Sequence, residues 1–517
     1  MVHKKFAVAL LAAAVGACTQ MPDQSIAPGK QNLQGQETAA IAASGADILK
    51  PAEKALPPVD IWDRLRRGFR LDRRIDDPKV KDYIAYYARN EGYMARVTER
   101  SRRYIFHVAE QLEQSNLPLE LALLPIVESA YDPFAYSHAR ASGMWQFIPA
   151  TGRSFGLHEN WWYDGRRDVA ESTRAAVQYF TYLSKRFNGD WELAMAAYNA
   201  GEGTVRRAIE RNRRRGQGTS FWDLKLPRET KRYVPQLLAL AEVVSRPDYY
   251  RVPLHDVANQ PYYTAVDVGS QIDLSQAAEL ADIEIEELYL LNPGFNRWAT
   301  DPNGNHRLLI PVEKQEIFTA ALADLPRDQR VTWQRYKIAR GDTLSTIARR
   351  YETTVAAIRE ANKLRGNSIR AGKTLLIPSA SGPAGQYAYA LDQRVKRRQS
   401  SGSGRKSSYT VRPGDTLWGI ARSLDVSVRQ LASWNSMAPG DTLRPGRTLV
   451  AYGGSDNSSR TTRKLSYRVR SGDSLYRIAS KFRIDIDDIL RWNKISKSSH
   501  LQPGQRLTLF VDSAASG

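Results

Sequence analysis

The chain has 517 residues, of which 25% are charged and 42% hydrophobic, a composition typical of globular proteins. This length predicts several domains, and the composition excludes both wholesale disorder and a membrane protein with many spans. The net charge of +20 lies at one end, because residues 331–517 hold 33 Lys and Arg against 13 Asp and Glu, whereas residues 1–330 hold 42 of each. This basic third indicates an anionic partner, which charge alone does not identify among nucleic acid, an acidic lipid surface and an anionic cell-wall polymer.

The first residues have the pattern of an export signal. Two lysines precede an apolar run at residues 6–15, which is too short to span a bilayer, and a Val-Gly-Ala stretch then leads to Cys18. The stretch resembles the lipobox of bacterial lipoproteins, which implies that residues 1–17 are a signal peptide and that Cys18, the only cysteine, carries a lipid anchor. Thr19 in place of an acidic residue implies, by the same resemblance, an outer-membrane lipoprotein that faces the periplasm of a Gram-negative bacterium. We therefore expect no nucleic-acid partner.

A tether and a helical region follow. Residues 18–60 are rich in Gln, Ala, Gly, Ser and Pro and lack periodicity, which predicts a flexible tether. In residues 61–250 apolar side chains recur at three- and four-residue spacing, which predicts an all-α domain. The expected helices cover residues 79–89, 94–115, 118–129, 168–187, 191–200 and 229–244.

The last third of the chain contains an internal repeat. Residues 335–379, 408–452 and 466–511 each begin with a β-like run, continue with Gly-Asp-Thr/Ser-Leu and end with an apolar strand. In each copy an Asn lies 20 residues after the Asp, and the pairs are Asp342 with Asn362, Asp415 with Asn435, and Asp473 with Asn493. We expect strand, helix, helix and strand in each copy, with the Asp capping the first helix.

These residues resemble the LysM module, a small βααβ domain, and the resemblance implies glycan-binding modules for sugars that contain N-acetylglucosamine. Residues 262–313 show a weaker echo, with Asn292 at the spacing seen in the repeats but no Gly-Asp-Thr-Leu. They are either a degenerate module or an unrelated α/β linker domain. Residues 379–408 and 453–466 are rich in Ser, Gly, Arg and Lys, which predicts linkers that let the modules move independently.

Glu128 is the candidate catalytic acid. It follows the apolar run at residues 121–127, a setting that disfavours the carboxylate and raises the pKa toward that of a proton donor at neutral pH. A helix-terminal Glu that faces water is the alternative. Ordinary glycoside hydrolysis needs a second carboxylate, and between Glu128 and Asp164 the only acids are Asp132 and Glu159, neither of which lies in a motif. The fold could still bring a distant carboxylate to Glu128.

Glu128 belongs to the first of four short sequence motifs. The stretches are Glu128-Ser129, Ser142-Gly143-Met144-Trp145-Gln146, Ala197-Tyr198-Asn199 and residues 229–234. In order and spacing they resemble the motifs of lytic transglycosylases of the goose-lysozyme-like superfamily. Met-Trp-Gln in the second motif, together with the LysM tail, is similar to the membrane-bound D branch of that family. The expected fold class is therefore multidomain, with an all-α lysozyme-like catalytic domain followed by small α+β (βααβ) LysM modules.

The resemblance implies a reaction with a single catalytic acid, in which the 2-acetamido group of the substrate can attack the anomeric carbon. Glu128 would first protonate the leaving oxygen of the β-1,4 bond between MurNAc and GlcNAc in peptidoglycan. As a carboxylate it would then deprotonate the muramoyl C6 hydroxyl, giving a 1,6-anhydro ring without water, metal or cofactor. The implied substrate-binding or orienting residues are Ser129, Ser142, Gln146, Tyr198, Asn199 and Tyr233.

Two other functions stay open at this point. A hydrolytic muramidase on the same fold would give reducing ends, and a wall-binding lipoprotein would have lost activity altogether. The aromatic triplet at residues 161–163 is likewise open, because it would serve equally well to stack on sugars or to pack in a core.

Overall fold

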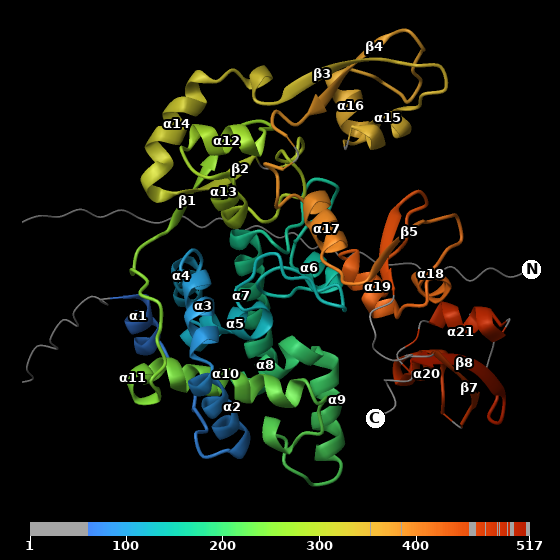
Figure 1. The fold of residues 1–517 in the computed structure, drawn as a ribbon. Coiled ribbons are helices and arrows are strands. Elements are labelled where there is room, and N and C mark those ends of the chain that lie inside the picture. The colour runs from blue at the N-terminus through green and yellow to red at the C-terminus, as the bar shows by residue number, and fades with distance from the viewer. Residues whose placement is uncertain are drawn as a thin grey trace, which may run out of the picture. The chain divides into compact units, whose positions relative to one another are not determined.

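The computed structural model describes residues 60–453, except 305, 352 and 384, and residues 462–512, except 471, 483, 485, 494 and 497–500 (Figure 1). The expected signal peptide, Cys18 and nearly all of the expected tether lie outside the described residues. Within the described part of the chain, no helix has both the length and the apolar character that crossing a membrane requires.

An all-α region comes first. Its helices are α1 (Ile61–Arg67), α2 (Pro78–Arg89), α3 (Glu91–Ser101), α4 (Ile105–Gln114), α5 (Leu124–Ser129), α6 (Pro149–Ser154), α7 (Val169–Arg186), α8 (Trp191–Ala200), α9 (Glu202–Arg213), α10 (Thr230–Ser245) and α11 (Pro247–Tyr250). Helix α10 packs against α2 and α8, and its side chains are buried along most of its length. Burial of these apolar faces supplies the main free energy that holds the bundle together.

Two of the expected helices are interrupted. The helix expected at residues 94–115 is divided into α3 and α4, because Thr98 and Ser101 donate their hydroxyls to the backbone carbonyls of Met94 and Thr98 at 2.8 and 2.7 Å and thereby bend the chain. The helix expected at residues 118–129 begins as a 3₁₀ turn and becomes α-helical only at α5. Pro125 has no N–H to continue the ladder from the preceding turn, so a new helix starts there.

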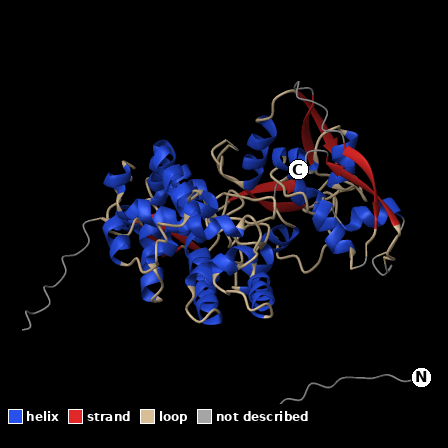
Figure 2. Ribbon diagram, turned by 90° about the horizontal axis from the view of Figure 1, so that it is seen from below, coloured by secondary structure: helices blue, strands red, loops and turns tan. Residues whose placement is uncertain are grey.

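Four small units of strand, helix, helix and strand follow. Their elements are β1 (Tyr263–Asp267), α12 (Leu274–Leu280), α13 (Ile285–Leu291) and β2 (Arg307–Pro311), then β3 (Thr332–Lys337), α15 (Leu344–Arg350), α16 (Val355–Ala361) and β4 (Thr374–Ser379), then β5 (Arg405–Thr410), α18 (Leu417–Ser423), α19 (Val428–Trp434) and β6 (Thr448–Gly453), and finally β7 (Thr462–Arg468), α20 (Leu475–Phe482), α21 (Ile486–Asn493) and β8 (Arg506–Asp512). In each unit the two strands pair antiparallel, as the short strand pairs of Figure 2 show. The predicted fold class is confirmed.

The repeated Asn is a structural strut in every unit. In the module of β5 and β6, Asn435 is fully buried, donates to the carbonyl oxygens of Leu431 and Val450 at 2.7 Å and accepts from the Val450 amide at 2.8 Å. The side chain therefore ties the second helix to the closing strand. The same three bonds are made by Asn292, Asn362 and Asn493 in the other units.

The repeated Asp does not cap the first helix, so that expectation is wrong. The residue after it supplies the cap, as when Thr416 accepts from the Gly419 amide at 3.1 Å. Asp415 instead accepts from the Arg412 amide at 2.7 Å and from the Tyr409 hydroxyl at 3.0 Å, which closes the turn before the helix. Asp342 and Asp473 make the corresponding bonds.

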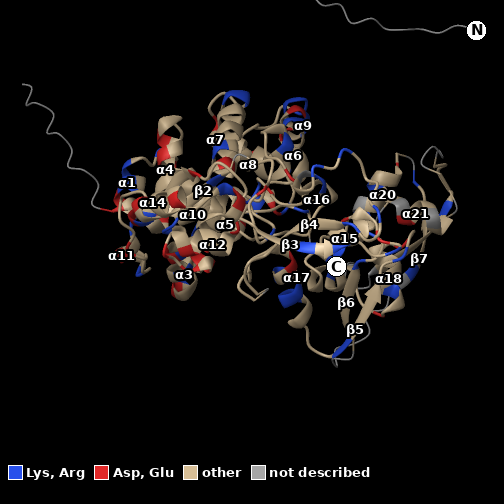
Figure 3. Ribbon diagram, turned by 90° about the horizontal axis from the view of Figure 1, so that it is seen from above, with Lys and Arg blue, Asp and Glu red and all other residues tan. Residues whose placement is uncertain are grey.

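The segment at residues 379–408 is not the free linker that its composition predicted. It contains α17 (Leu391–Ser400), whose Lys and Arg colour much of that helix blue in Figure 3. Tyr387 is buried and donates its hydroxyl to Asp273 at 2.9 Å, and the Leu391 amide donates to the Asn296 carbonyl at 2.8 Å. These bonds fasten the segment to the unit of β1 and β2.

Candidate active site

Glu128 stands in the last turn of α5, next to the fully buried residues 121–124. Its side chain is half-buried, and its Oε1 accepts a hydrogen bond of 2.6 Å from the hydroxyl of Tyr233 on α10. The pKa of Glu128 is raised to about 7, mainly by burial; the Tyr233 hydrogen bond lowers this pKa and the Glu229 carboxylate raises it. At neutral pH the side chain is therefore divided between an acid that donates a proton and a carboxylate that accepts one.

Two tyrosines flank the carboxyl group. Burial, and after it the neighbouring Glu128 carboxylate, raise the pKa values of Tyr198 and Tyr233 well above the ordinary 10, so both phenols stay protonated donors. The Tyr198 hydroxyl donates to the Trp145 carbonyl at 2.7 Å, and its ring stacks on Phe180 with centroids 4.5 Å apart. Of the two phenols, Tyr233 is the one whose hydroxyl donates to Glu128.

The second motif lies in a segment that we call the motif loop, residues 140–147. Ser129 donates its hydroxyl to the Met144 carbonyl at 3.0 Å, so the loop is tied to the residue that follows Glu128. Gln146 donates its amide to the Gly143 carbonyl at 2.8 Å and has a φ of +51°, which marks a tight turn at the tip. The structure thus brings Ser129, Gln146 and Tyr198 together around the loop beside Glu128.

The remaining predicted residues have different settings. Asn199 accepts from the Thr230 hydroxyl at 2.8 Å through its Oδ1, which leaves its Nδ2 as the group that can donate to a ligand. Ser142 is fully buried inside the motif loop, and its hydroxyl has no partner among the residues that the structure describes. The structure therefore does not bring the Ser142 hydroxyl to the surface of the site.

The two acids singled out in the sequence as possible partners of Glu128 are engaged elsewhere. Glu159 forms an ion pair with Arg166 at 2.8 Å, and Asp132 accepts from the Phe134 amide at 2.9 Å. The carboxylate that acts on the Glu128 pKa is that of Glu229, which begins the fourth motif but was given no role beside Glu128 in the sequence. Its position four residues before Tyr233 on a helix predicts a shared face and could have revealed it.

The aromatic triplet belongs to a packed contact. Trp162 is buried at 4% exposure and meets Trp298 edge to face with centroids 5.9 Å apart. Tyr163 donates its hydroxyl to Asp168 at 2.8 Å and lies against Phe295. These contacts favour the packing alternative for both residues.

Comparison with known proteins finds family models in several parts of the chain. The transglycosylase SLT domain matches residues 106–221, and the LysM-like domain of lytic transglycosylase MltD matches residues 262–327. The LysM domain matches residues 336–378, 409–451 and 467–510.

Individual relatives cover very different shares of the chain. An autolysin of Enterococcus faecalis is 30% identical over 191 residues, which are 35% of this chain and 25% of the autolysin. Among solved structures, an inactive mutant of lytic transglycosylase Slt from Pseudomonas aeruginosa is 23% identical with a TM-score of 0.23, covering 28% of this chain and 24% of that one. Membrane-bound lytic murein transglycosylase D of Escherichia coli K12 is 35% identical over 483 residues, which are 92% of this chain and 91% of the relative. The likeness to this last relative extends over nearly the whole of both chains, so the protein is a lytic transglycosylase with LysM modules and belongs to the family of membrane-bound lytic murein transglycosylase D.

Proposed function

We propose that this protein cleaves the β-1,4 bond between MurNAc and GlcNAc in peptidoglycan without consuming water and leaves 1,6-anhydro-MurNAc ends. One observation carries the proposal, namely a single half-buried carboxyl group, Glu128, with a pKa near 7 and a hydrogen bond from Tyr233. A group with that pKa is protonated often enough to act as an acid and ionised often enough to act as a base. A single carboxyl group is then sufficient for both proton transfers.

In the first step the Glu128 carboxyl donates its proton to the glycosidic oxygen as the bond to the anomeric carbon breaks, and the 2-acetamido oxygen of the substrate attacks that carbon. In the second step the muramoyl C6 oxygen displaces the acetamido group while its proton moves to the Glu128 carboxylate. The acid form is restored, so the cycle has no net demand for a proton or for water.

The surrounding residues hold this group and the sugar in place. Tyr233 orients the carboxyl group through its hydroxyl, and Tyr198 and Ser129 hold the motif loop through the Trp145 and Met144 carbonyls. Asn199, whose Nδ2 is left to donate, suits a carbonyl oxygen such as that of an acetamido group.

The modules and the N-terminus place the enzyme at its substrate. We assign peptidoglycan binding to the LysM modules, whose repeated Asp and Asn side chains support the fold while other surfaces take the glycan. The excess of Lys and Arg in residues 331–517 attracts the carboxylates of the wall, over a range of about 8–10 Å at physiological salt. A lipid on Cys18 would hold the protein at the outer membrane, facing the periplasm of a Gram-negative bacterium.

The test is digestion of purified peptidoglycan with the wild type and with Glu128→Gln, followed by mass spectrometry of the products. We expect anhydro-muropeptides from the wild type and none from the variant. Glu113→Gln, which removes an exposed partner of Arg64, is the matched control and should cut like the wild type. Reducing ends from the wild type would identify a hydrolytic muramidase, and absence of any cutting would identify a wall-binding protein.

A further inference from the structure

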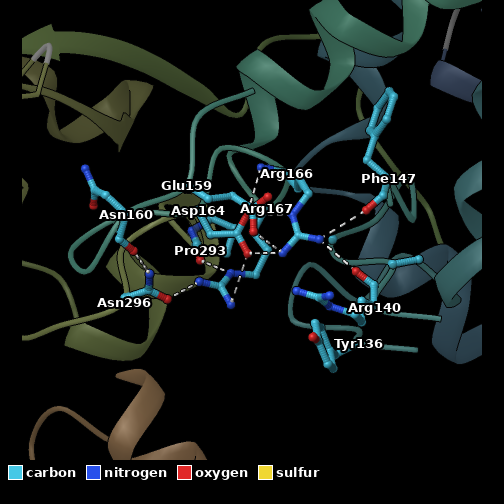
Figure 4. Close-up of polar contacts among 12 residues, drawn as sticks. Tyr136, Arg140, Phe147, Glu159, Asn160, Asp164, Arg166, Arg167, Pro293 and Asn296 are labelled. Atoms are coloured by element: carbon cyan, nitrogen blue, oxygen red, sulfur yellow. Dashed lines mark hydrogen bonds and ion pairs between the residues drawn. The ribbon is translucent and has the colours of Figure 1, made fainter. Parts of the chain in front are cut away.

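The unit of β1 and β2 contacts the helical domain through a buried turn. We call this turn the docking turn, residues 293–296. The Gly294 carbonyl accepts from the Asp164 amide at 2.8 Å, and the Pro293 carbonyl accepts from Nε of Arg167 at 3.0 Å. Nη2 of Arg167 also donates to the Asn296 side chain, as Figure 4 shows.

Behind the docking turn lies a buried charge cluster. Arg166 donates two parallel hydrogen bonds of 2.9 Å, from Nε and Nη2, to the Asp164 carboxylate. Nη1 of Arg167 lies 3.9 Å from an oxygen of the same carboxylate. All three residues are at most 7% exposed. Charges removed from water to this extent are tolerated only when each one is paired in good geometry, so the cluster fixes the directions of both guanidinium groups.

The far side of the cluster holds the motif loop. Nη1 of Arg166 donates to the Arg140 carbonyl at 2.7 Å and approaches the Phe147 carbonyl at 3.4 Å, so one guanidinium group fastens both ends of the loop (Figure 4). The loop also lies directly on the Arg166 backbone, because a Cβ atom on Gly143 would be 2.1 Å from the Arg166 carbonyl oxygen. A shift of Arg166 is therefore a shift of the loop.

We propose that residues 262–330 form a brace for the active site, acting through Asn296, Arg167, Asp164 and Arg166 on the motif loop. These are positioning residues, since none of them touches Glu128. The brace holds one side of the loop, while Ser129 and Tyr198 hold the other through the Met144 and Trp145 carbonyls. The inference rests on the proposed function of the site and adds a task for the LysM-like domain that differs from glycan binding.

The test compares variants of the full chain at the same domain interface. Asn296→Ala removes the side chain that faces Arg167, and Asn296→Asp keeps an oxygen acceptor there. Glu287→Gln is the matched control, because it weakens the ion pair of 2.7 Å with Arg103 across the same interface without touching the cluster. The readouts are kcat/KM on soluble glycan strands across pH and deuterium exchange of the motif-loop amides.

For Asn296→Ala we expect a roughly ten- to hundredfold loss of kcat/KM, since a small misplacement of a substrate-holding group has an effect of that size. Exchange should rise in residues 140–147, and the pH at which activity falls should not move, because burial and Tyr233 still set the Glu128 pKa. Asn296→Asp should regain most of the rate, and Glu287→Gln should leave both the rate and the loop exchange near those of the wild type.

Two results would overturn the brace. One is equal loss in Asn296→Ala and Glu287→Gln, which would indicate general weakening of the interface. The other is unchanged exchange in the motif loop of Asn296→Ala. Failure of the proposed function is recognised separately, because it would show as wild-type products without anhydro ends.

Discussion

Replacement of Tyr233 by Phe removes one hydroxyl and tests what sets the Glu128 pKa. The bond it removes is 2.6 Å long, in the range of charge-assisted O–H···O⁻ bonds. Such a bond is worth about 1.5–3 kcal/mol, and about 1.4 kcal/mol corresponds to one pKa unit. The phenol also donates to the protonated carboxyl group, so only part of this energy separates the two states. We therefore expect Tyr233→Phe to raise the pKa of Glu128 by about one unit above the value near 7.

The assay is kcat/KM as a function of pH, which reports ionisations of the free enzyme. Glu128 must be protonated to start the reaction, so activity falls as pH rises through its pKa. In Tyr233→Phe the plateau should drop roughly tenfold because the carboxyl group loses its orienting bond, while the fall should begin about one pH unit higher. The curves of wild type and variant should consequently converge at alkaline pH.

Tyr198→Phe is the control for this experiment. Its hydroxyl donates to the Trp145 carbonyl, so loss of this hydroxyl should lower the plateau of kcat/KM without changing the pH at which kcat/KM falls. Two results would refute a role of the Tyr233 hydroxyl in lowering the Glu128 pKa. One is a ratio of wild-type to Tyr233→Phe activity that stays constant with pH, and the other is a Tyr233→Phe activity that falls at a lower pH than that of the wild type.

Three other predictions concern stability and backbone geometry. The pKa of Glu128 is raised from the ordinary 4.5 to about 7 in the folded state, so ionisation of this carboxyl group lowers the free energy of unfolding progressively between pH 4.5 and pH 7. Glu128→Gln should therefore melt at a higher temperature than wild type above pH 7 and at the same temperature below pH 4.5. Gly143→Ala places a Cβ 2.1 Å from the Arg166 carbonyl at a φ of +81°, so kcat/KM should fall at least roughly tenfold, and wild-type activity would contradict the described loop. Asn435→Ala leaves buried backbone groups unpaired and should destabilise its module by about 2–4 kcal/mol, seen as faster deuterium exchange confined to residues 409–452.

Much of the helical domain could be predicted because the residues that start and end its helices lie next to those helices in the sequence. The α7 helix begins where Asp168 accepts from the Glu171 amide at 2.8 Å and ends before Gly189, as capping chemistry requires. The apolar run before Glu128 likewise predicted a raised pKa, and burial is indeed its main cause. Enzyme class also followed from the motifs, whereas the catalytic roles of the individual residues stay predictions.

What could not be predicted depends on residues that are distant in sequence. Arg167 and Asn296 are 129 positions apart, and no periodicity relates a loop after α6 to a turn after α13. The linker prediction for residues 379–408 was wrong for the same reason. A segment rich in Gly, Ser and basic residues predicts a free linker, and the sequence does not reveal that Tyr387 donates its hydroxyl to the distant Asp273.

The repeat itself illustrates why a sequence pattern identifies a fold more readily than a binding surface. The Asn that recurs 20 residues after the Asp forms its side-chain hydrogen bonds inside its own unit. Its recurrence therefore indicates how the second helix is bonded to the closing strand. In residues 262–313 that strut persists as Asn292, and the docking turn begins at the very next residue. The strut therefore holds the start of the turn whose carbonyl groups face Asp164 and Arg167. A unit that keeps this hydrogen-bonded Asn can retain its fold while its outer turns contact another part of the protein, which here is the catalytic domain.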